Sequence, residues 1–494
     1  MKIEVKNFGP IKKGTVDLDK KVTVFVGYNN SGKTYMSQLL WGLNSFYSLS
    51  EYNGGNFIPS LIFDKNGITS LSSEIIKNWT DGFDVFIKSH VLPSVFNVKS
   101  DYFSNEQFLF KLKEEFTDHI FAHAFTYVAA IRNDDIKNKP STFSSLLLFE
   151  KKANSFQVSF ERSDFDRLLQ YPEIRTENVI LNLNPEASYL LIYKNTVPFD
   201  SIAKEAISSI IFRILFDSVH SPFLLPANRV FYPSFIRYIF SSAKEERDAA
   251  ENIIKNGGIV QEGLLKKPYS EPIDVLIDRL YNLNTTTEAK PFYLDLIDEL
   301  NGLIGGNIEM KSTGFGPVEF NLKLATEKEL DMYMSSSAAN QLTTLYLYLK
   351  YWAEEKDNYL IIDEPEENLH PDNQIKLVNI LMKFADRNNN KILITTHSPL
   401  ITDHINNYAN LSYLKEQDVD VSSMVNDKFT HMANIESIAH KDYGVYFFNG
   451  SGIQEYEVGN YGAYFEDFQK AENNVKETSN ALKNSIYDKL HPNA

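Results

Sequence analysis

Short apolar, β-branched runs alternate along the chain with longer segments of helical periodicity. Residues 21–26 (KVTVFV), 359–362 and 392–395 have the character of buried strands. Residues 34–43 (TYMSQLLWGL) and 370–387 (HPDNQIKLVNILMKFADR) have the apolar spacing of helices. Strands that alternate with helices in this way predict an α/β fold with parallel strands.

The two halves of this predicted α/β unit lie far apart in the sequence. Gly27 and Asp363 each follow a predicted strand and are 336 positions apart (363 minus 27), which implies a large insertion. The insertion mixes aromatic-rich segments, such as 102–131, with strand-like pieces, such as 154–164 and 187–200. It has no sustained heptads, so a long coiled coil is not expected. The expected segments are 1–45 and 311–415 as the two halves of the α/β lobe, 46–219 as an inserted mixed and helical lobe, 220–310 as a strand plus a helical subdomain, and 416–494 as a C-terminal α+β extension.

Composition restricts the compartment and the partners. The 494 residues include no cysteine, so disulfides and cysteine-based zinc sites are excluded and a reducing compartment fits. No apolar run of about 18 residues occurs, and the first residues lack the apolar core of a signal peptide, so a cytoplasmic, soluble chain without a membrane partner is expected. The net charge of −16 gives no overall attraction to nucleic acid, and any such contact would need a local basic patch.

The strongest chemical signal follows the first predicted strand. Residues 27–34 (GYNNSGKT) match the P-loop pattern G-x-x-x-x-G-K-[ST] between a strand and a helix, as that motif requires. Backbone N–H groups of such a loop surround phosphate, its lysine neutralises phosphate oxygens, and its hydroxyl reaches Mg²⁺. A glycine-rich turn in an unrelated strand-helix unit is the alternative. The residues expected to hold ATP and Mg²⁺ here are Gly27, Asn29, Asn30, Ser31, Gly32, Lys33 and Thr34.

Two carboxylates and a histidine follow the other predicted strands. Asp363 is suited to hold Mg²⁺, and Glu364 to polarise the attacking water. His397 lies at the carboxyl edge of the predicted sheet, where it could sense the γ-phosphate and help to orient that water. An acidic loop and an ordinary loop histidine are the alternatives. Because a P-loop is present, we expect Glu364, His397 and Lys33 to be catalytic.

Four stretches together resemble the ABC-type ATPases of the SMC and OLD-like branch. They are IEVKNFGPIKKGTVDLDKKVTVFVGYNNSGKT at 3–34, SSSAANQLTTLYLYLKYW at 335–352, IIDEPEENLHPDNQ at 361–374 and ITTHSPL at 394–400. The resemblance implies an ABC-type P-loop ATPase head with a large mixed and helical insertion and a small C-terminal extension. It also implies a homodimer in which the P-loop of one subunit and the serine-rich signature of the other enclose ATP at two shared sites. A higher oligomer is a further possibility.

The signature segment departs from the family pattern at one position. Ser336 and Ser337 match the first two residues of a Ser-Ser-Gly signature, but Ala338 stands where the family usually has glycine. Their hydroxyls and N–H groups would meet the γ-phosphate across the dimer, and the departure implies slow turnover. These serines are predicted to open an amphipathic helix with Leu342, Leu345 and Leu349 inward. A serine N-cap on a core helix is the alternative.

Two more positions come from the resemblance. Asn368 falls, with His370, in the segment that resembles the D-loop, which crosses to the partner's site. Arg229 lies in FLLPANRVFYPSF, which resembles the LPAxR strand of many OLD-like ATPases. It could contact phosphate or the partner lobe, or equally be a surface charge at a strand end.

A nuclease within the C-terminal segment is not expected. Its single D-x-D, in DVDVSS, lacks the preceding E-G-x-x-D strand of a Toprim nuclease, and no arginine follows Arg387 to build the RNA-cutting site of other relatives. The segment is expected to form two short strands and a helix with Phe465, Phe468, Ala471 and Val475 on one face. These elements could cap the core or dock a partner or sister subunit.

Two classes of function follow. In the first, the chain resembles the ATPases of the Septu, PARIS and some retron systems of bacterial anti-phage defence, in which nucleotide state controls a separate nuclease or toxin subunit. In the second, the chain is a stand-alone ATPase that acts on DNA or RNA through its own lobe. The insertion has scattered lysines without a dense basic run, which favours the first class.

Overall fold

The computed structural model describes residues 2–45, 68–72, 83–111, 148–152, 155–159, 182–184, 187–189, 221–235, 269–312, 317–421 and 432–490. The chain divides into two compact units. One comprises Met1–Glu4, Phe46–His90 and Gln107–Val219, and the other comprises Val5–Ser45, Val91–Glu106 and His220–Ala494.

The first unit contains short antiparallel pairings among its described residues. β4 (Ile68–Ser72), β7 (Ser155–Ser159) and β6 (Leu148–Lys152) form one small sheet in that order, and β8 (Asn182–Asn184) pairs with β9 (Ala187–Tyr189). β7 and β9 fall within the strand-like pieces of the insertion. Most of the predicted aromatic-rich segment 102–131 lies outside the described residues.

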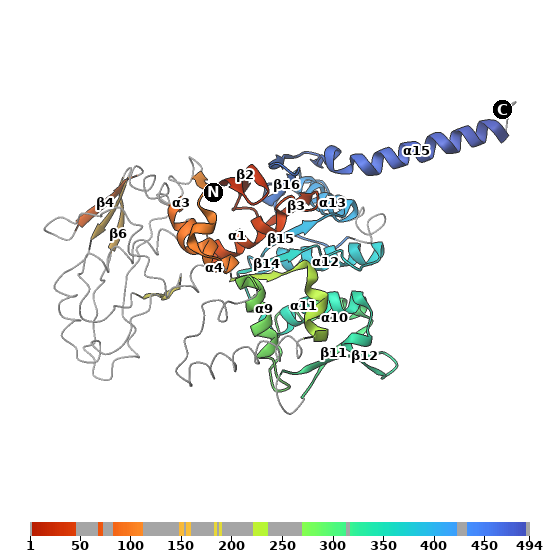
Figure 1. Ribbon diagram of the computed structural model, residues 1–494, viewed down its shortest axis with the longest axis horizontal. Helices are drawn as coiled ribbons and strands as arrows, with labels where there is room; N and C mark the ends of the chain where they lie inside the picture. Colours follow the sequence, from red (N-terminus) through yellow and green to blue (C-terminus); the bar gives the residue numbers. More distant parts are fainter. Residues whose placement is uncertain are drawn as a thin grey trace. The chain divides into compact units, whose positions relative to one another are not determined.

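A six-stranded sheet organises the second unit (Figure 1). Its order is β10 (Ser221–Leu225), β14 (Asn358–Asp363), β15 (Lys391–Thr396), β3 (Val22–Gly27), β16 (Tyr443–Phe448) and β17 (Ile453–Tyr456). The first five strands are parallel, and β17 runs antiparallel to β16. The three strands predicted from apolar runs are therefore confirmed as neighbours.

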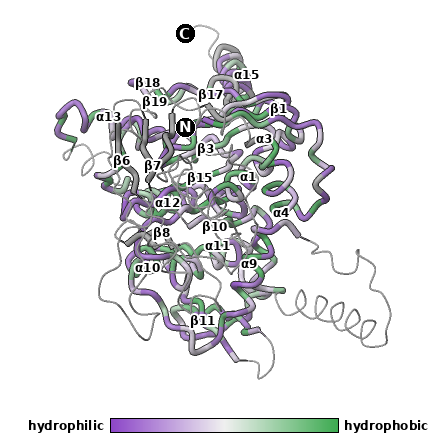
Figure 2. Tube along the Cα trace, turned by 90° about the vertical axis from the view of Figure 1, so that its left-hand side faces the viewer, coloured by the Kyte–Doolittle hydropathy of each residue, from purple (hydrophilic) through white to green (hydrophobic). Residues whose placement is uncertain are grey.

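Helices cover both faces of this sheet. α1 (Lys33–Ser45) packs on one face, and α12 (Pro371–Asp386) lies on the other, so the two helices appear on opposite sides of β15 in Figure 2. Alternate strand positions divide accordingly: Leu360, Ile362 and Ile394 join the core under α12, whereas Ile361 and Leu393 point to the opposite face. Both helices were predicted from apolar spacing.

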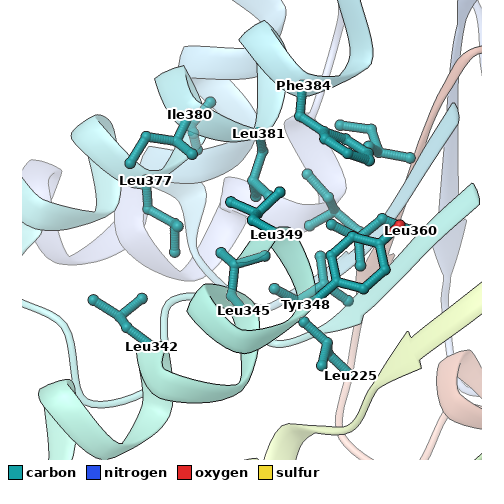
Figure 3. Close-up of a cluster of buried hydrophobic side chains, with 14 of the residues drawn as sticks. Leu225, Leu342, Leu345, Tyr348, Leu349, Leu360, Leu377, Ile380, Leu381 and Phe384 are labelled. Atoms are coloured by element: carbon teal, nitrogen blue, oxygen red, sulfur yellow. The ribbon is translucent and has the colours of Figure 1, made fainter. Parts of the chain in front are cut away.

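The core between α11 (Ser337–Leu347) and α12 is made of interlocking aliphatic and aromatic side chains (Figure 3). Leu342, Leu345 and Leu349 are buried there, as predicted. Further elements of this unit include β2 (Ile11–Asp17), α4 (Leu92–Phe96), η3 (Ala227–Val230), α9 (Glu271–Tyr281), α10 (Leu294–Ile304), β11 (Gly306–Lys311), β12 (Glu319–Leu324), β13 (Glu329–Asp331), α13 (Pro399–Glu416) and α15 (Glu466–Leu490), and the part of β1 (Lys2–Phe8) from Val5 onward.

The predicted apolar face of the C-terminal helix is wrong in one respect. α15 begins at Glu466, and Phe465 precedes it as a buried loop residue whose ring meets Tyr456 edge-on. Val475 is 69% exposed on the helix, so it does not share the environment of Phe465. The side chains of Phe468 and Ala471 lie outside the described part of the chain. No helix among the described residues is long and apolar enough to cross a membrane.

The packing in Figure 3 predicts the stability of one pair of variants. Leu381 is 1% exposed between α11 and α12, and Leu381→Ala should lower the free energy of unfolding by about 2–5 kcal/mol because it leaves a cavity. The matched control Leu482→Ala, at a side chain 61% exposed on α15, should change it by about 0.5 kcal/mol or less. Urea denaturation measures both. Equal losses at the two positions would contradict this core.

Candidate active site

The loop between β3 and α1 has the backbone of a phosphate cradle. Gly27 and Gly32 have φ values of 142° and 100°, and a side chain at either position would collide, with the Phe448 carbonyl or with Ile11. Asn30 is also left-handed, at φ 57°. The loop therefore exposes the N-terminus of α1, whose unpaired N–H groups and helix dipole attract an anion.

Lys33 lies within this cradle. Its Nζ donates to the backbone oxygens of Gly27 (3.2 Å) and Tyr28 (2.9 Å), and the buried Ser31 hydroxyl also donates to the Tyr28 oxygen (2.7 Å). Burial lowers the pKa of Lys33 to about 8, against the opposing effect of nearby carboxylates. The ammonium group is thus held close to the predicted phosphate position and is mostly charged at neutral pH. Asn29, Asn30 and Thr34 are exposed on the same loop and at the start of α1.

Asp363 ends β14 as a fully enclosed carboxylate. Its Oδ1 accepts hydrogen bonds from Thr395 Oγ1 (3.0 Å) and Ser37 Oγ (3.2 Å). The Ser37 hydroxyl also lies 3.1 Å from the backbone oxygen of Thr34, so Asp363 and the P-loop helix share one donor. Burial raises the pKa of Asp363 to about 6 despite these bonds.

Glu364, His397 and Lys33 meet at the carboxyl edge of the sheet. His397 Nε2 lies 3.0 Å from Lys33 Nζ and 3.3 Å from Glu364 Oε1. One ring nitrogen cannot serve both neighbours at once, because with its proton it donates to Glu364 and without it accepts from Lys33. The hydrogen bond from His397 lowers the pKa of Glu364. Phosphate oxygens beside these groups would accept from both Lys33 and His397 and remove that competition.

Glu366 holds His397 in place. Its Oε1 accepts from the His397 backbone N–H (2.7 Å) and from the Thr396 hydroxyl (2.6 Å). Glu366 and the two donors to Asp363, Ser37 and Thr395, were not among the site residues predicted from the sequence. A signal was present for two of them: Ser37 lies one helical turn after Lys33, and hydroxyl residues end the strand before His397.

The interpretation of Arg229 as a surface charge is wrong. Its side chain is 0% exposed. The guanidinium donates to the backbone oxygens of Gln341 (3.2 Å), Pro226 (3.0 Å), Asp363 (2.6 Å) and Glu364 (3.4 Å). Burial lowers the pKa of Arg229 to about 10, which leaves it charged at neutral pH. Because it is enclosed and its donors point to carbonyls, this structure does not offer it to phosphate or to a second subunit either.

The remaining predicted residues lie outside this cluster. Ser336 is the N-cap of α11, and its hydroxyl accepts from the Ala339 N–H (3.1 Å). Ser336 and Ser337 are both exposed. Asn368 is exposed with φ 61° in the loop between β14 and α12, and His370 caps α12 by accepting from the Asp372 N–H. Within the described part of one chain, neither Ser336 nor Ser337 forms a hydrogen bond with the P-loop.

The residues at this edge fit a hard cation beside phosphate. Asp363 and Thr34 carry oxygen atoms of the kind that Mg²⁺ prefers and would be the residues to hold it, and the Ser37 hydroxyl lies within hydrogen-bond distance of the Asp363 carboxylate and of the Thr34 backbone oxygen. When bound, Mg²⁺ would neutralise charge that develops on phosphate oxygens.

This topology and this cluster define an ABC-type P-loop ATPase fold. Residues 1–402 match the family model described as an AAA ATPase domain, and the chain belongs to that family. Nucleotide binding and P-loop character follow from this membership.

Comparisons with other known proteins add little to that assignment. The solved structures similar to the chain include an SMC head bound to the C-terminal winged-helix domain of ScpA, at 12% identity over 82% of this chain and 91% of the other, with a TM-score of 0.31. A Pyrococcus furiosus Smc head with an extended coiled coil matches at 11% identity (97% and 98% covered, TM-score 0.31), and a Thermotoga maritima SMC head at 9% (92% and 98% covered, TM-score 0.28). A comparison with curated proteins finds no match. The assignment rests on the family match, the sheet and the site.

The buried carboxylate predicts a dependence of stability on pH. The folded-state pKa of Asp363, about 6, lies above its ordinary value of 3.8, so the cost of the buried charge is absent below pH 3.8, grows as the pH rises from 3.8 to about 6, and is fully present above that. Asp363→Asn should therefore stabilise the ligand-free protein at pH 8 by about 2–3 kcal/mol. This advantage should shrink as the pH falls to 5.

Denaturation of both proteins at pH 8 and pH 5 measures this effect. Asp331→Asn, at an exposed residue that ends β13, is the control and should show no such trend. An equal or larger advantage of Asp363→Asn at pH 5 would contradict the burial of a charged Asp363.

Proposed function

We propose that this protein hydrolyses ATP with Mg²⁺ and uses the nucleotide state as a switch. The observation that carries the proposal is the contact of Lys33, His397 and Glu364 at the mouth of the P-loop. A lysine for phosphate, a carboxylate for the attacking water and a histidine between them are groups suited to phosphoryl transfer to water.

Each residue has a distinct role in this proposal. The P-loop N–H groups and Lys33 hold the phosphates, and Thr34 and Asp363 hold Mg²⁺. Glu364 orients and polarises the water, helped by a pKa that keeps it ionised. His397 donates to the γ-phosphate region, and Glu366 fixes the position of its backbone. The burial of Asp363 and Lys33 strengthens their interactions with phosphate and metal because the surroundings contain little water.

The proposed working unit is a homodimer that encloses ATP. The exposed N-terminus of α11, capped by Ser336, presents N–H groups and the Ser337 hydroxyl to a second copy's γ-phosphate. Asn368 would cross to the partner in the same arrangement. Ala338 adds a Cβ next to these serines, so the approach to phosphate is less close than with glycine, and slow turnover is expected.

The proposed output is control of a separate nuclease or toxin subunit in an anti-phage defence complex. The motifs' resemblance to such ATPases supports this proposal, and slow hydrolysis suits a switch that persists in its ATP state. The second candidate is an ATPase that acts on DNA or RNA by itself. Copurification from the native operon separates the two, because a stoichiometric protein partner supports the first and retained nucleic acid alone supports the second.

Substitution of the proposed base tests the chemistry. Glu364→Gln keeps the size of the side chain but removes the carboxylate, and should lower kcat for ATP by about 100-fold or more while ATP stays bound. The variant should accumulate as an ATP-bound dimer, visible by light scattering. The control Glu355→Gln, at an exposed carboxylate before β14, should keep the wild-type rate. A Glu364→Gln protein that turns over like wild type would exclude Glu364 as the base.

A further inference from the structure

Arg229 is an unusual cation, because it is enclosed in the protein and makes its hydrogen bonds to backbone oxygens. Its four acceptors come from three parts of the chain: Pro226 beside it, Gln341 in α11, and the pair Asp363 and Glu364 at the end of β14. An enclosed guanidinium is costly unless its donors are satisfied, and its planar fork fixes the directions of its partners. The arrangement therefore fixes the backbone that carries the catalytic carboxylates.

The backbone of Glu364 needs such support. Its φ of 45° is in the left-handed region, which a residue with a side chain adopts only when the surroundings hold it there. On one side, the Glu364 N–H donates to the Thr395 carbonyl of β15 (2.9 Å). On the other side, its carbonyl accepts from Arg229 Nη2 (3.4 Å), and the preceding Asp363 carbonyl accepts from Nη1 (2.6 Å). The sheet and Arg229 together thus define where the Glu364 side chain begins.

The anchor of Arg229 is itself rigid. Arg229 lies in η3, directly after β10, and its Nε donates to the Gln341 carbonyl within α11. Gln341 is buried, and its Nε2 donates back to the Ala227 carbonyl (3.3 Å). Further along the same segment, the Ser234 hydroxyl donates to Asn340 of α11. η3 and α11 therefore hold each other at several points, and Arg229 extends from this joint to the strand end.

We propose that Arg229 is a positioning residue for hydrolysis. By hydrogen bonding to the carbonyls of Asp363 and Glu364, it holds Glu364 in its left-handed conformation. The inference rests on the proposed ATPase function. Arg229 does not touch substrate in this role; it acts through Glu364. Loss of these hydrogen bonds should allow the Glu364 backbone to relax, so that the carboxylate no longer points to His397 and the water. ATP binding by the P-loop should be preserved, because none of its residues bonds to Arg229.

Two substitutions distinguish the effect of these Arg229 hydrogen bonds on Glu364 from a general loss of stability. Arg229→Met removes every donor, and Arg229→Lys keeps the charge and part of the donor set. With saturating Mg²⁺ and ATP, kcat should fall by about 100-fold in Arg229→Met and about 10-fold in Arg229→Lys, with KM within about 3-fold of wild type. Leu381→Ala is the control, since it weakens the core away from the site and should retain the wild-type kcat at a temperature where it is folded. In the Glu364→Gln background, Arg229→Lys should cause no further loss, because both changes remove the same contribution.

Hydrogen exchange supplies a readout that does not depend on turnover. Amides at 363–367 should exchange faster in Arg229→Lys than in wild type, while those in the middle of α12 stay unchanged. A wild-type kcat in Arg229→Lys, or unchanged exchange at 363–367, overturns the inference and leaves the ATPase proposal intact. A wild-type protein that binds ATP without hydrolysing it overturns the ATPase proposal instead, and the exchange data still decide whether Arg229 holds Glu364.

Discussion

The parallel pairing of β3, β15 and β14 is the constraint on which the site depends. In this register Asp363 lies beside Thr395, and Thr396 beside Val26, so the three strands end at the same edge. Every group with a proposed chemical role at this edge lies at the end of one of those strands or in the segment that follows it. A shift of one residue in either pairing would turn the side chains to the opposite faces and separate the carboxylates from the P-loop. The aliphatic core under α12 is what makes such a shift costly.

Enclosed charge is the second theme of the structure. Lys33, Asp363 and Arg229 are all buried. Burial lowers the pKa of Lys33 and Arg229 and raises that of Asp363, and in each case this favours the uncharged form. Hydroxyl donors to Asp363 and carbonyl acceptors around Lys33 and Arg229 offset part of that cost. The buried charges therefore lower the stability of the folded protein when no ligand is present, and a bound polyphosphate with a divalent cation would offset that loss. Part of the free energy of binding that ligand would then go into ordering the side chains of the site.

The sequence predicted the local parts of this site well and the long-range parts poorly. Strands, helices and P-loop could be read from residues 21–43 and 359–397 because apolar periodicity and glycine spacing are local signals. The position of His397 at the same sheet edge as Glu364 followed from the rule that parallel strands share a carboxyl edge, but their direct contact was not predicted. The burial of Arg229 could not be predicted, since it depends on α11, which lies more than a hundred residues away. Phe465 was assigned to the helix because periodicity alone does not mark where a helix begins.

Phosphate release from a single turnover tests the central claim most directly. Purified wild-type protein in excess over γ-labelled ATP would be mixed with or without Mg²⁺, and free phosphate followed over time. The account predicts slow, Mg²⁺-dependent release of phosphate from protein-bound ATP. Bound ATP that stays intact with Mg²⁺ present, or release that does not depend on the metal, would contradict the proposed roles of the groups at this sheet edge.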